Sequence, residues 1–348
     1  MLLFCKKDSP LARWSGDSPF EVNRELDLDQ SHPVQLFKNW LRLRKAVREF
    51  RPDVLNPHCP PGHSLLAIVR ALEHRRAPLI RTVADPRPPS KNPLNWLLHR
   101  MFTDGMLFTT ASSLRRYKGF VNLARMKHQV ILPGFRAPDF VNGVRGGGYR
   151  ARFGIKPEQL FLGIIARMSP EKGQEVFLEA MALLKPDERS KLFCVMAGED
   201  AKERGQEELK TIAKLFGVQK QVRFLSRLDD VRPLMSELDV GVITSTRSEA
   251  ICRVALEYMS FGIPVIASDV NILPEVVRNG ENGLTFPNQS APALAECLRK
   301  LLQHTDEPNR LGARGREMVL TTFSLQREIE ETVTFYQHAL SAKRGSRL

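Results

Sequence analysis

The sequence predicts an α/β protein made of two Rossmann-like domains. From residue 160 to about residue 322, short apolar runs of strand length alternate with helical patterns, which is typical of a parallel sheet covered by helices on both faces. The amino-terminal half shows a second, less regular alternation, and a stretch rich in Gly, Pro and Arg lies within residues 135–149. A length of 348 residues suits two domains of ordinary size.

The expected elements of the first half follow from its apolar runs and from the turn residues between them. They are, in order, a basic amphipathic segment at 34–50, a strand at 52–58, a helix near 64–73, a strand at 78–83, a polar loop at 84–92, a strand, turn and helix within 105–114, and a closing strand at 130–134. We expect this first domain to span 1–137 and a linker to span 138–150. Gly146, Gly147 and Gly148 lie in this linker, because no apolar strand leads into them.

In the second half, apolar strands are followed by polar turns and helical patterns. Strands are expected at 160–166, 193–198, 222–226, 240–245 and 264–268, and helices at 176–184, at 230–238 and after 249. These elements make up an expected domain at 151–325. A last helix, at about 326–342, begins the remaining segment 326–348.

The stretch 248–257 places two glutamates, Glu249 and Glu257, at the start of a helix that follows a buried strand. In a parallel sheet such a junction points unpaired amide N–H groups and the helix dipole at a ligand. Residues eight apart on a straight helix are rotated by about 80°. The two carboxylates therefore share a pocket only if Glu249 lies before or at the first turn. On spacing alone, two solvated carboxylates are the simpler interpretation.

Arg167 and Lys172 flank the loop between the strand at 160–166 and the next helix. Such a pair can neutralise a diphosphate, because arginine offers a planar bidentate fork and lysine a point charge. Charged loops are common at this place in α/β folds, so the pair alone indicates a solvated loop as readily as an anion site.

Together the two motifs resemble the donor-binding signature of the retaining glycosyltransferases of the GT-B fold, family 4 (group 1). The family pattern E-G-F-G-x-x-x-L-E-A-M-A-x-G-x-P-V-V-A is matched at Glu249, Leu256, Glu257, Met259, Gly262, Pro264, Val265 and Ala267. The family pattern G-x-x-x-R-x-x-x-x-K-G is matched at Gly163, Arg167, Lys172 and Gly173. The sequence departs from the first pattern at Ala250 and Cys252, where the family commonly has glycine or another small residue. Both residues are small, so a sugar can still approach the backbone.

The resemblance implies two domains facing a cleft, and the transfer of a sugar from a nucleotide diphosphate sugar to an acceptor hydroxyl with retained configuration. Arg167 and Lys172 would bind the diphosphate and stabilise the departing nucleotide in place of a metal ion, so neither a metal nor a cofactor is expected. Glu257 would accept hydrogen bonds from the ribose, and Glu249 would hold the sugar ring. The other expected donor-site residues are Gly163, Gly198, Arg227, Leu228, Ala250, Ile251 and Cys252.

The resemblance is incomplete in the first half. The chain opens with apolar residues 1–5, which resemble the family's second strand, so the glycine-rich opening βα unit is expected to be missing. Ala84 stands where many members have a histidine that contacts the transferred sugar. His58 and Asp85 are the candidate acceptor-side residues. A surface position explains His58 equally well, and an Asx-type turn explains Asp85.

Charge narrows the class of partner. The net charge of +13 and the pI near 9.8 favour anionic partners, and the sequence has no run of 18 or more apolar residues that would predict a membrane span. The basic amphipathic stretch 38–48 is either a solvated helix face or a docking surface for anionic lipid headgroups. No nucleic-acid partner is expected, because no recognised binding module accompanies the charge.

The five cysteines are scattered without metal-ligand spacing, which is consistent with reduced thiols in a cytosolic protein. The sequence thus predicts a cytoplasmic glycosyltransferase, peripheral at the inner face of the plasma membrane. Its expected acceptor is a saccharide or is lipid-linked, in the synthesis of bacterial cell-surface polysaccharide, lipopolysaccharide or glycolipid. The alternative is a non-catalytic homologue that binds nucleotide sugar or acts as a scaffold. A GT-B-like sugar-nucleotide epimerase finds no support in the motifs.

Overall fold

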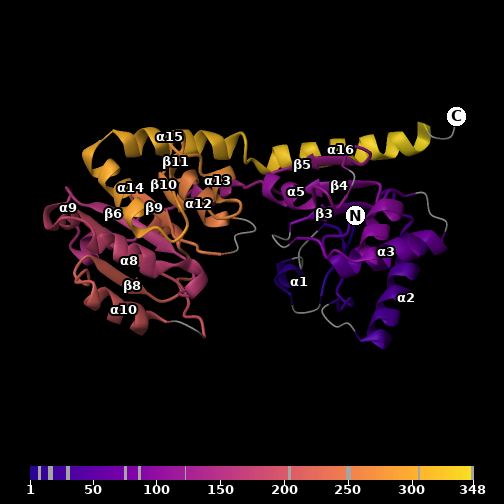
Figure 1. The fold of residues 1–348 in the computed structure, drawn as a ribbon, viewed down its shortest axis with the longest axis horizontal. Helices are drawn as coiled ribbons and strands as arrows, with labels where there is room; N and C mark the ends of the chain where they lie inside the picture. Colours follow the sequence, from indigo (N-terminus) through magenta and orange to yellow (C-terminus); the bar gives the residue numbers. More distant parts are fainter. Residues whose placement is uncertain are drawn as a thin grey trace. The chain divides into compact units, whose positions relative to one another are not determined.

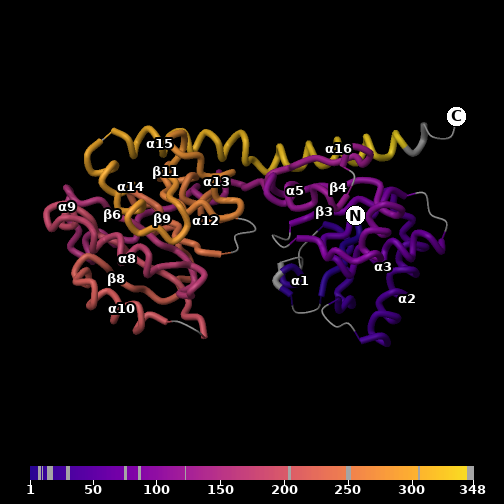
Figure 2. Tube along the Cα trace, viewed as in Figure 1, coloured from indigo at the N-terminus to yellow at the C-terminus, as the bar shows by residue number. Residues whose placement is uncertain are grey.

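The computed structural model describes residues 1–6, 9–14, 19–28, 32–73, 77–84, 88–121, 123–202, 205–247, 252–304 and 306–345 (Figure 2). Contacts within the chain divide it into unit 1, which contains Met1–Ile131 and Glu330–Leu348, and unit 2, which contains Leu132–Ile329. The expected linker 138–150 belongs to unit 2. There the backbone N–H of Gly147 donates to the carbonyl of Pro233, and that of Arg150 donates to the Glu237 carboxylate.

Unit 2 is built on a six-stranded parallel sheet with the strand order β11-β10-β9-β6-β7-β8 (Figure 1). The strands are β6 (Leu160–Ile165), β7 (Leu192–Ala197), β8 (Val222–Leu225), β9 (Val240–Ile243), β10 (Val265–Ser268) and β11 (Gly283–Phe286). The chain leaves β6 toward β7 and β8 on one side and returns to β9, β10 and β11 on the other. This is the doubly wound order, in which the topological switch point lies between β6 and β9.

Helices cover both faces of this sheet, because alternate side chains of each strand point to opposite faces. One face packs α8 (Gln174–Ala182), α10 (Gln206–Leu215) and α14 (Ala291–Gln303) onto strand residues such as Leu162 and Ile164. The other face packs α11 (Arg232–Met235), α12 (Arg253–Ser260), α13 (Leu273–Val276) and α15 (Glu307–Leu320) onto residues such as Phe161 and Val195. The remaining short helices of unit 2 are α6 (Ala137–Val141), α7 (Tyr149–Phe153), η3 (Pro170–Lys172) and α9 (Pro186–Ser190).

The contact between α12 and α15 is as close as two backbones allow. A Cβ built on Gly312 would lie 1.9 Å from the carbonyl oxygen of Gly262, and one built on Gly315 would lie 3.1 Å from the Cγ of Met259. The packing of α15 on the end of α12 therefore requires glycine at 312, and it leaves little room for a side chain at 315.

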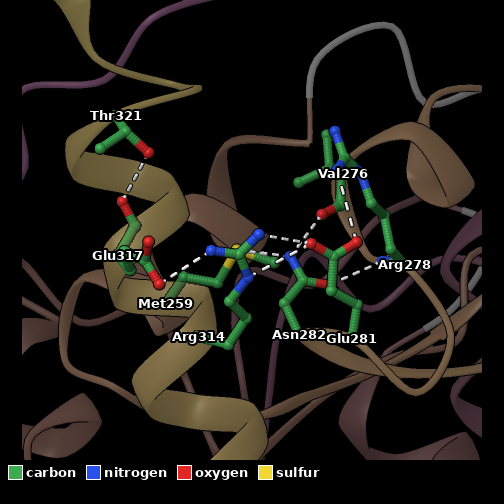
Figure 3. Close-up of polar contacts among 8 residues, drawn as sticks. All are labelled: Met259, Val276, Arg278, Glu281, Asn282, Arg314, Glu317 and Thr321. Atoms are coloured by element: carbon green, nitrogen blue, oxygen red, sulfur yellow. Dashed lines mark hydrogen bonds and ion pairs between the residues drawn. The ribbon is translucent and has the colours of Figure 1, made fainter.

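A polar cluster fixes α15 to the turn that precedes β11 (Figure 3). Arg314 donates to the Glu281 carboxylate at 2.8 Å and pairs with Glu317 at 2.8 Å. Beside them, the Asn282 amide donates to the carbonyl of Val276 at 2.9 Å and lies 3.9 Å from the sulfur of Met259 on α12. One cluster thus joins α12, α15 and the start of β11.

Unit 1 contains a three-stranded parallel sheet and a separate parallel pair of strands. The sheet has the order β3 (Ile80–Val83), β4 (Gly105–Phe108) and β5 (Lys127–Val130), and the pair is β1 (Leu2–Phe4) with β2 (Glu21–Asn23). The helices are α1 (Pro10–Trp14), α2 (Pro33–Phe50), α3 (Pro60–Leu72), α4 (Pro93–Leu97), η2 (Leu98–Phe102) and α5 (Ala111–Tyr117). Helix α16 (Leu325–Gly345) adds Phe335 and Ala339 to the core beside Ile80 and Leu107.

Four expected elements differ from the structure. The strand expected at 52–58 is only one bridge, from Leu55 to Leu79, because Pro52 and Pro57 have no N–H to give to a ladder. The helix near 64–73 begins at Pro60, since proline suits the first helical turn, where no N–H is needed. The closing strand ends at Val130, and the helix expected at 230–238 is confined to α11.

Gly312→Ala and Gly315→Ala add the same methyl group to α15 and the same gain in helix propensity, about 1 kcal/mol. On Gly312 the methyl would meet a backbone carbonyl, whereas on Gly315 it would meet the side chain of Met259, which can move. We expect Gly312→Ala to lower the free energy of unfolding by at least about 1 kcal/mol net, and Gly315→Ala to change it by less. Urea unfolding followed by circular dichroism measures both. Equal losses would contradict this account of the packing.

Candidate active site

A cavity of about 190 Å³ lies at the topological switch point of unit 2. The carboxyl ends of β6 and β9, the end of η3 and the start of α12 surround it. Its lining residues are Ile164, Ile165, Ala166, Lys172, Val242, Ile243, Thr244, Ser245, Cys252, Arg253 and Val254. In open α/β sheets, ligands bind outside the carboxyl ends of the strands at this point, where diverging connections leave a crevice.

Hydrogen bonds join the loop after β6 to the loop after β9. The hydroxyl of Thr244 donates to the carbonyl of Lys172 at 2.7 Å, and the backbone N–H of Thr246 donates to the carbonyl of Glu171 at 2.8 Å. Gly173 has a φ of +61°, and a Cβ there would lie 2.3 Å from the carbonyl oxygen of Thr244. Glycine is needed at 173 on both counts. The result is that Lys172 is held at the wall of the cavity.

Arg167 lies on the same loop but does not line the cavity. It is exposed, and the amide of Gln174 donates to its carbonyl at 2.8 Å. Glu171, on the same loop, has a carboxyl whose pKa is lowered. The largest cause is a hydrogen bond from the backbone N–H of Glu171 itself, and smaller causes are a hydrogen bond from Ser169 and the charges of Arg247 and Arg167. Two arginines from the loops after β6 and β9 therefore act on one carboxylate at the edge of the site.

Glu257 is placed by the first turns of α12. Its side chain is 14% exposed, and Arg253, one turn earlier, pairs with it at 3.0 Å. Burial raises the pKa of the Glu257 carboxyl, while the charge and the hydrogen bond of Arg253 lower it. The helix begins at Arg253, with Cys252 as its N-cap in a non-helical conformation. Glu249, Ala250 and Ile251 lie outside the residues that the structure describes.

Gly163 does not line the cavity. It is buried in the middle of β6, and a Cβ there would lie 2.3 Å from the Cδ1 of Leu238. The hydroxyl of Tyr258, on α12, donates to the carbonyl of Gly163 at 2.9 Å and accepts from the backbone N–H of Ile165 at 3.1 Å. Gly163 thus contributes to the packing of α12 on β6 rather than to the lining of the cavity.

Three of the other residues expected at the donor site lie at the ends of β7 and β8. Gly198 packs so closely on the end of β6 that a Cβ would lie 1.9 Å from the carbonyl oxygen of Ala166. Arg227 is exposed and pairs with Glu199 at 3.7 Å, and Leu228 is half-buried. Neither Arg227 nor Leu228 lines the cavity at β6 and β9.

The two acceptor-side candidates belong to unit 1. His58 is exposed, and its Nε2 lies 3.3 Å from the amide nitrogen of Asn56. Asp85 lies outside the described residues, and Ala84 directly follows β3. No group of three or more His, Cys, Asp or Glu side chains in the described part of the chain is arranged to hold a metal ion.

Comparison with known proteins shows which family the domain around this cavity matches. Residues 148–318, which contain the switch-point cavity, match the family model of the glycosyl transferases group 1. Unit 2 thus contains a domain that matches the glycosyl transferases group 1. EpsD of Bacillus subtilis (strain 168), provisionally named a glycosyltransferase, is 27% identical over 309 residues, 85% of this chain and 79% of EpsD.

Other relatives of this glycosyltransferase match over shorter lengths. The D-inositol 3-phosphate glycosyltransferase of Corynebacterium glutamicum (strain R) is 29% identical over 201 residues, 55% of this chain and 46% of the relative. Thus the match spans about half the length of that relative. The crystal structure of Anabaena HepE in complex with UDP and glucose superposes with a TM-score of 0.73 at 20% identity, covering 96% of this chain and 91% of HepE. The likeness shows that the glycosyltransferase has the GT-B fold.

Sequence reasoning missed two features of the glycosyltransferase site. Arg253 both lines the cavity and pairs with Glu257, and the i,i+4 spacing of an arginine and a glutamate was a signal for that pair. Thr244 fixes Lys172 through a hydroxyl-to-carbonyl bond. No sequence pattern predicts this bond, because residues 172 and 244 meet only once the sheet has formed.

Proposed function

We propose that this glycosyltransferase moves a sugar from a nucleotide diphosphate sugar to an acceptor hydroxyl, with retained anomeric configuration, in the synthesis of a bacterial cell-surface polysaccharide, lipopolysaccharide or glycolipid. The observation that carries the proposal is the cavity at the switch point, where Lys172 and the amino-terminal end of α12 line one space. A lysine and a helix N-terminus together favour a diphosphate. Support also comes from HepE, whose structure contains UDP.

In the proposed reaction, negative charge develops on the diphosphate as the bond to the sugar breaks. Lys172 and the first N–H groups of α12 would stabilise that charge without reorganising, because the loop of Lys172 is bonded to the end of β9. Arg167 would approach the diphosphate from the exposed edge. Neither a metal ion nor a cofactor is part of the proposal, since these positive groups carry the developing charge.

Glu257 would bind the ribose hydroxyls, and Glu249 would hold the sugar ring. Glu257 is suited to its part because Arg253 fixes its carboxylate, leaving it half-buried but still accessible. The amides of Ala250, Ile251 and Cys252 would assist Glu249. The alternative function, a non-catalytic homologue that binds nucleotide sugar, is favoured by Ala84, which has no group to contact a transferred sugar.

Unit 1 supports an acceptor with an apolar part. A cavity of about 1130 Å³ lies between α3 and the segment formed by α4 and η2. We call it the α3–α4 cavity. Most of its lining is apolar, including Ile68, Leu72, Leu94 and Leu97, which are also exposed. Pockets of this size and character suit an apolar ligand better than a bare saccharide, which would leave its hydroxyls without partners. The proposed acceptor is therefore lipid-linked.

Lys172→Ala tests the diphosphate site. The change removes one charge-assisted contact, worth about 1.5–3 kcal/mol, so the affinity for UDP or GDP should fall roughly tenfold or more. Lys220→Ala, at an exposed lysine of the same unit, is the matched control and should bind as the native chain does. Calorimetry measures all three proteins. Unchanged affinity in Lys172→Ala would place the diphosphate elsewhere.

Glu257→Gln and Glu249→Gln should have different effects on nucleotide binding and on donor turnover. Glu257→Gln should weaken the free nucleoside diphosphate and the full donor alike, because both contain ribose. Glu249→Gln should spare the nucleoside diphosphate and lower turnover of the donor, since its contact matters as the sugar bond breaks. Binding and turnover are measured side by side.

Arg253→Ala controls for the lost ion pair of Glu257. If it reproduces the effect of Glu257→Gln in full, the glutamate acts by positioning Arg253 and not by binding ribose. If both glutamate variants change binding and turnover by less than about 0.5 kcal/mol, the usual range of surface substitutions, neither glutamate belongs to the donor site. Normal donor binding by the native chain with no transfer to any acceptor would favour the non-catalytic alternative.

Ile68→Glu tests the α3–α4 cavity. Alkyl glucosides of increasing chain length, kept below their micelle concentrations, should bind the native chain more tightly by up to about 0.8 kcal/mol for each buried methylene. A carboxylate on the wall of the cavity should flatten this dependence, and because Ile68 is 49% exposed the fold should not suffer. Leu215→Glu, on α10 of unit 2, is the control. A chain-length dependence that persists in Ile68→Glu would show that the alkyl chain binds elsewhere.

A further inference from the structure

The net positive charge of the chain lies almost entirely on one of its two units. Unit 1 contains 25 Lys and Arg residues against 13 Asp and Glu, whereas unit 2 contains 27 against 26. Unit 1 thus accounts for nearly all of the net charge of +13, although it has fewer residues than unit 2. An excess of this size on one unit attracts an anionic surface and orients the molecule toward it.

Exposed apolar side chains are concentrated on the same unit. Of the 17 large apolar side chains that are exposed in the described part of the chain, 13 belong to unit 1. Single exposed apolar residues are ordinary. A unit that combines them with a large positive charge suits an anionic lipid surface, which offers both charged headgroups and an apolar interior.

Helix α2 brings the two properties together on one face. Its inward face packs Leu43 and Val47 into the core of unit 1. The opposite face, which we call the outer face of α2, consists of Val34, Phe37, Lys38, Leu41 and Lys45. These positions follow the i, i+3, i+4, i+7, i+11 spacing of one helix face. Val34, Phe37 and Leu41 are 55%, 58% and 43% exposed.

The lysines of the outer face are not used to hold the fold. Arg44 and Arg48, on the side of α2 toward α3, pair with Glu73, just after the end of α3. Lys45 lies 3.9 Å from Glu49 with both side chains largely exposed, a contact worth little in water. The arginines of α2 therefore join it to the end of α3. The lysines of its outer face lie in solvent beside exposed apolar side chains.

We propose that the outer face of α2 docks on the surface of an anionic lipid bilayer, with Val34, Phe37 and Leu41 entering the headgroup boundary and Lys38 and Lys45 contacting lipid phosphates. None of the described helices is long and apolar enough to cross a membrane. The amphipathic pattern suits a helix that lies in the plane of the interface instead. Docking needs no sugar donor, so it stands or fails independently of the proposed reaction.

The test measures binding of the full chain to sedimented vesicles. Vesicles of phosphatidylcholine with phosphatidylglycerol should bind the native chain, and vesicles of phosphatidylcholine alone should bind it much more weakly. Raising the salt from about 0.1 M to about 0.5 M should release most of the protein, because the lysine contacts are screened. Leu41→Ser and Lys45→Glu should each weaken binding about fivefold or more, and the double variant should weaken it further.

A matched control is available on unit 2. Lys214 and Leu215 are an exposed lysine and an exposed leucine at the end of α10. The double variant Lys214→Glu, Leu215→Ser makes the same changes in charge and polarity and should bind vesicles as the native chain does. Circular dichroism confirms that each variant is folded, which is expected because all four side chains are exposed.

Each contrary outcome overturns the proposal. Equal binding to neutral and anionic vesicles, or equal losses in the α2 and α10 variants, would show adsorption without a specific face. If Lys45→Glu weakens binding but Leu41→Ser does not, and a DNA oligonucleotide of mixed sequence competes the protein from the vesicles, unit 1 carries a general polyanion site and not a lipid-docking face.

Discussion

The site depends on the backbone contact between the loops after β6 and β9. At the switch point the chain connections diverge, so nothing in the sheet itself holds these two loops together. Thr244 and Gly173 do so: a hydroxyl bonds the carbonyl of Lys172, and the absence of a side chain at 173 lets the two backbones touch. Because the two loops are joined here, Lys172 is held at the wall of the cavity.

Helix α12 is held near its carboxyl end by β6 and by α15, and its orientation decides what faces the cavity. Tyr258 reaches across to β6 and bonds two backbone groups of that strand, while Gly241 on β9 leaves room for its ring. Just beyond the end of α12, α15 lies against Gly262, and the Arg314–Glu281 cluster of Figure 3 fixes α15 in turn. Arg253 and Glu257 lie one turn apart on this fixed helix. A small shift of α15 would therefore reach the donor side of the site.

The sequence predicted five of the six strands of unit 2, because buried parallel strands are continuous apolar runs between glycines and polar turns, and it did not predict β11. The positions of Lys172 and Glu257 followed from motifs that combine such a strand with the next helix. Gly163 does not line the cavity, and a side chain there would meet Leu238, a residue 75 positions away that no local pattern connects to it. The segment 52–58 was predicted to be a full strand from its apolar residues, but its two prolines limit it to one bridge. The uneven charge could be counted only after the boundaries of the units were known.

Helix α16 affects how unit 1 can form. Phe335 and Ala339 complete the core beside Ile80 and Leu107, and Lys127 binds the carbonyl of His338, 211 residues later in the chain. During synthesis, which proceeds at about 5–20 residues per second, the first strands of unit 1 wait until the whole of unit 2 has been made. Through that interval the apolar side chains that α16 will cover stay exposed on a nascent chain. Unit 2 is continuous in sequence, so its core can be completed before that of unit 1.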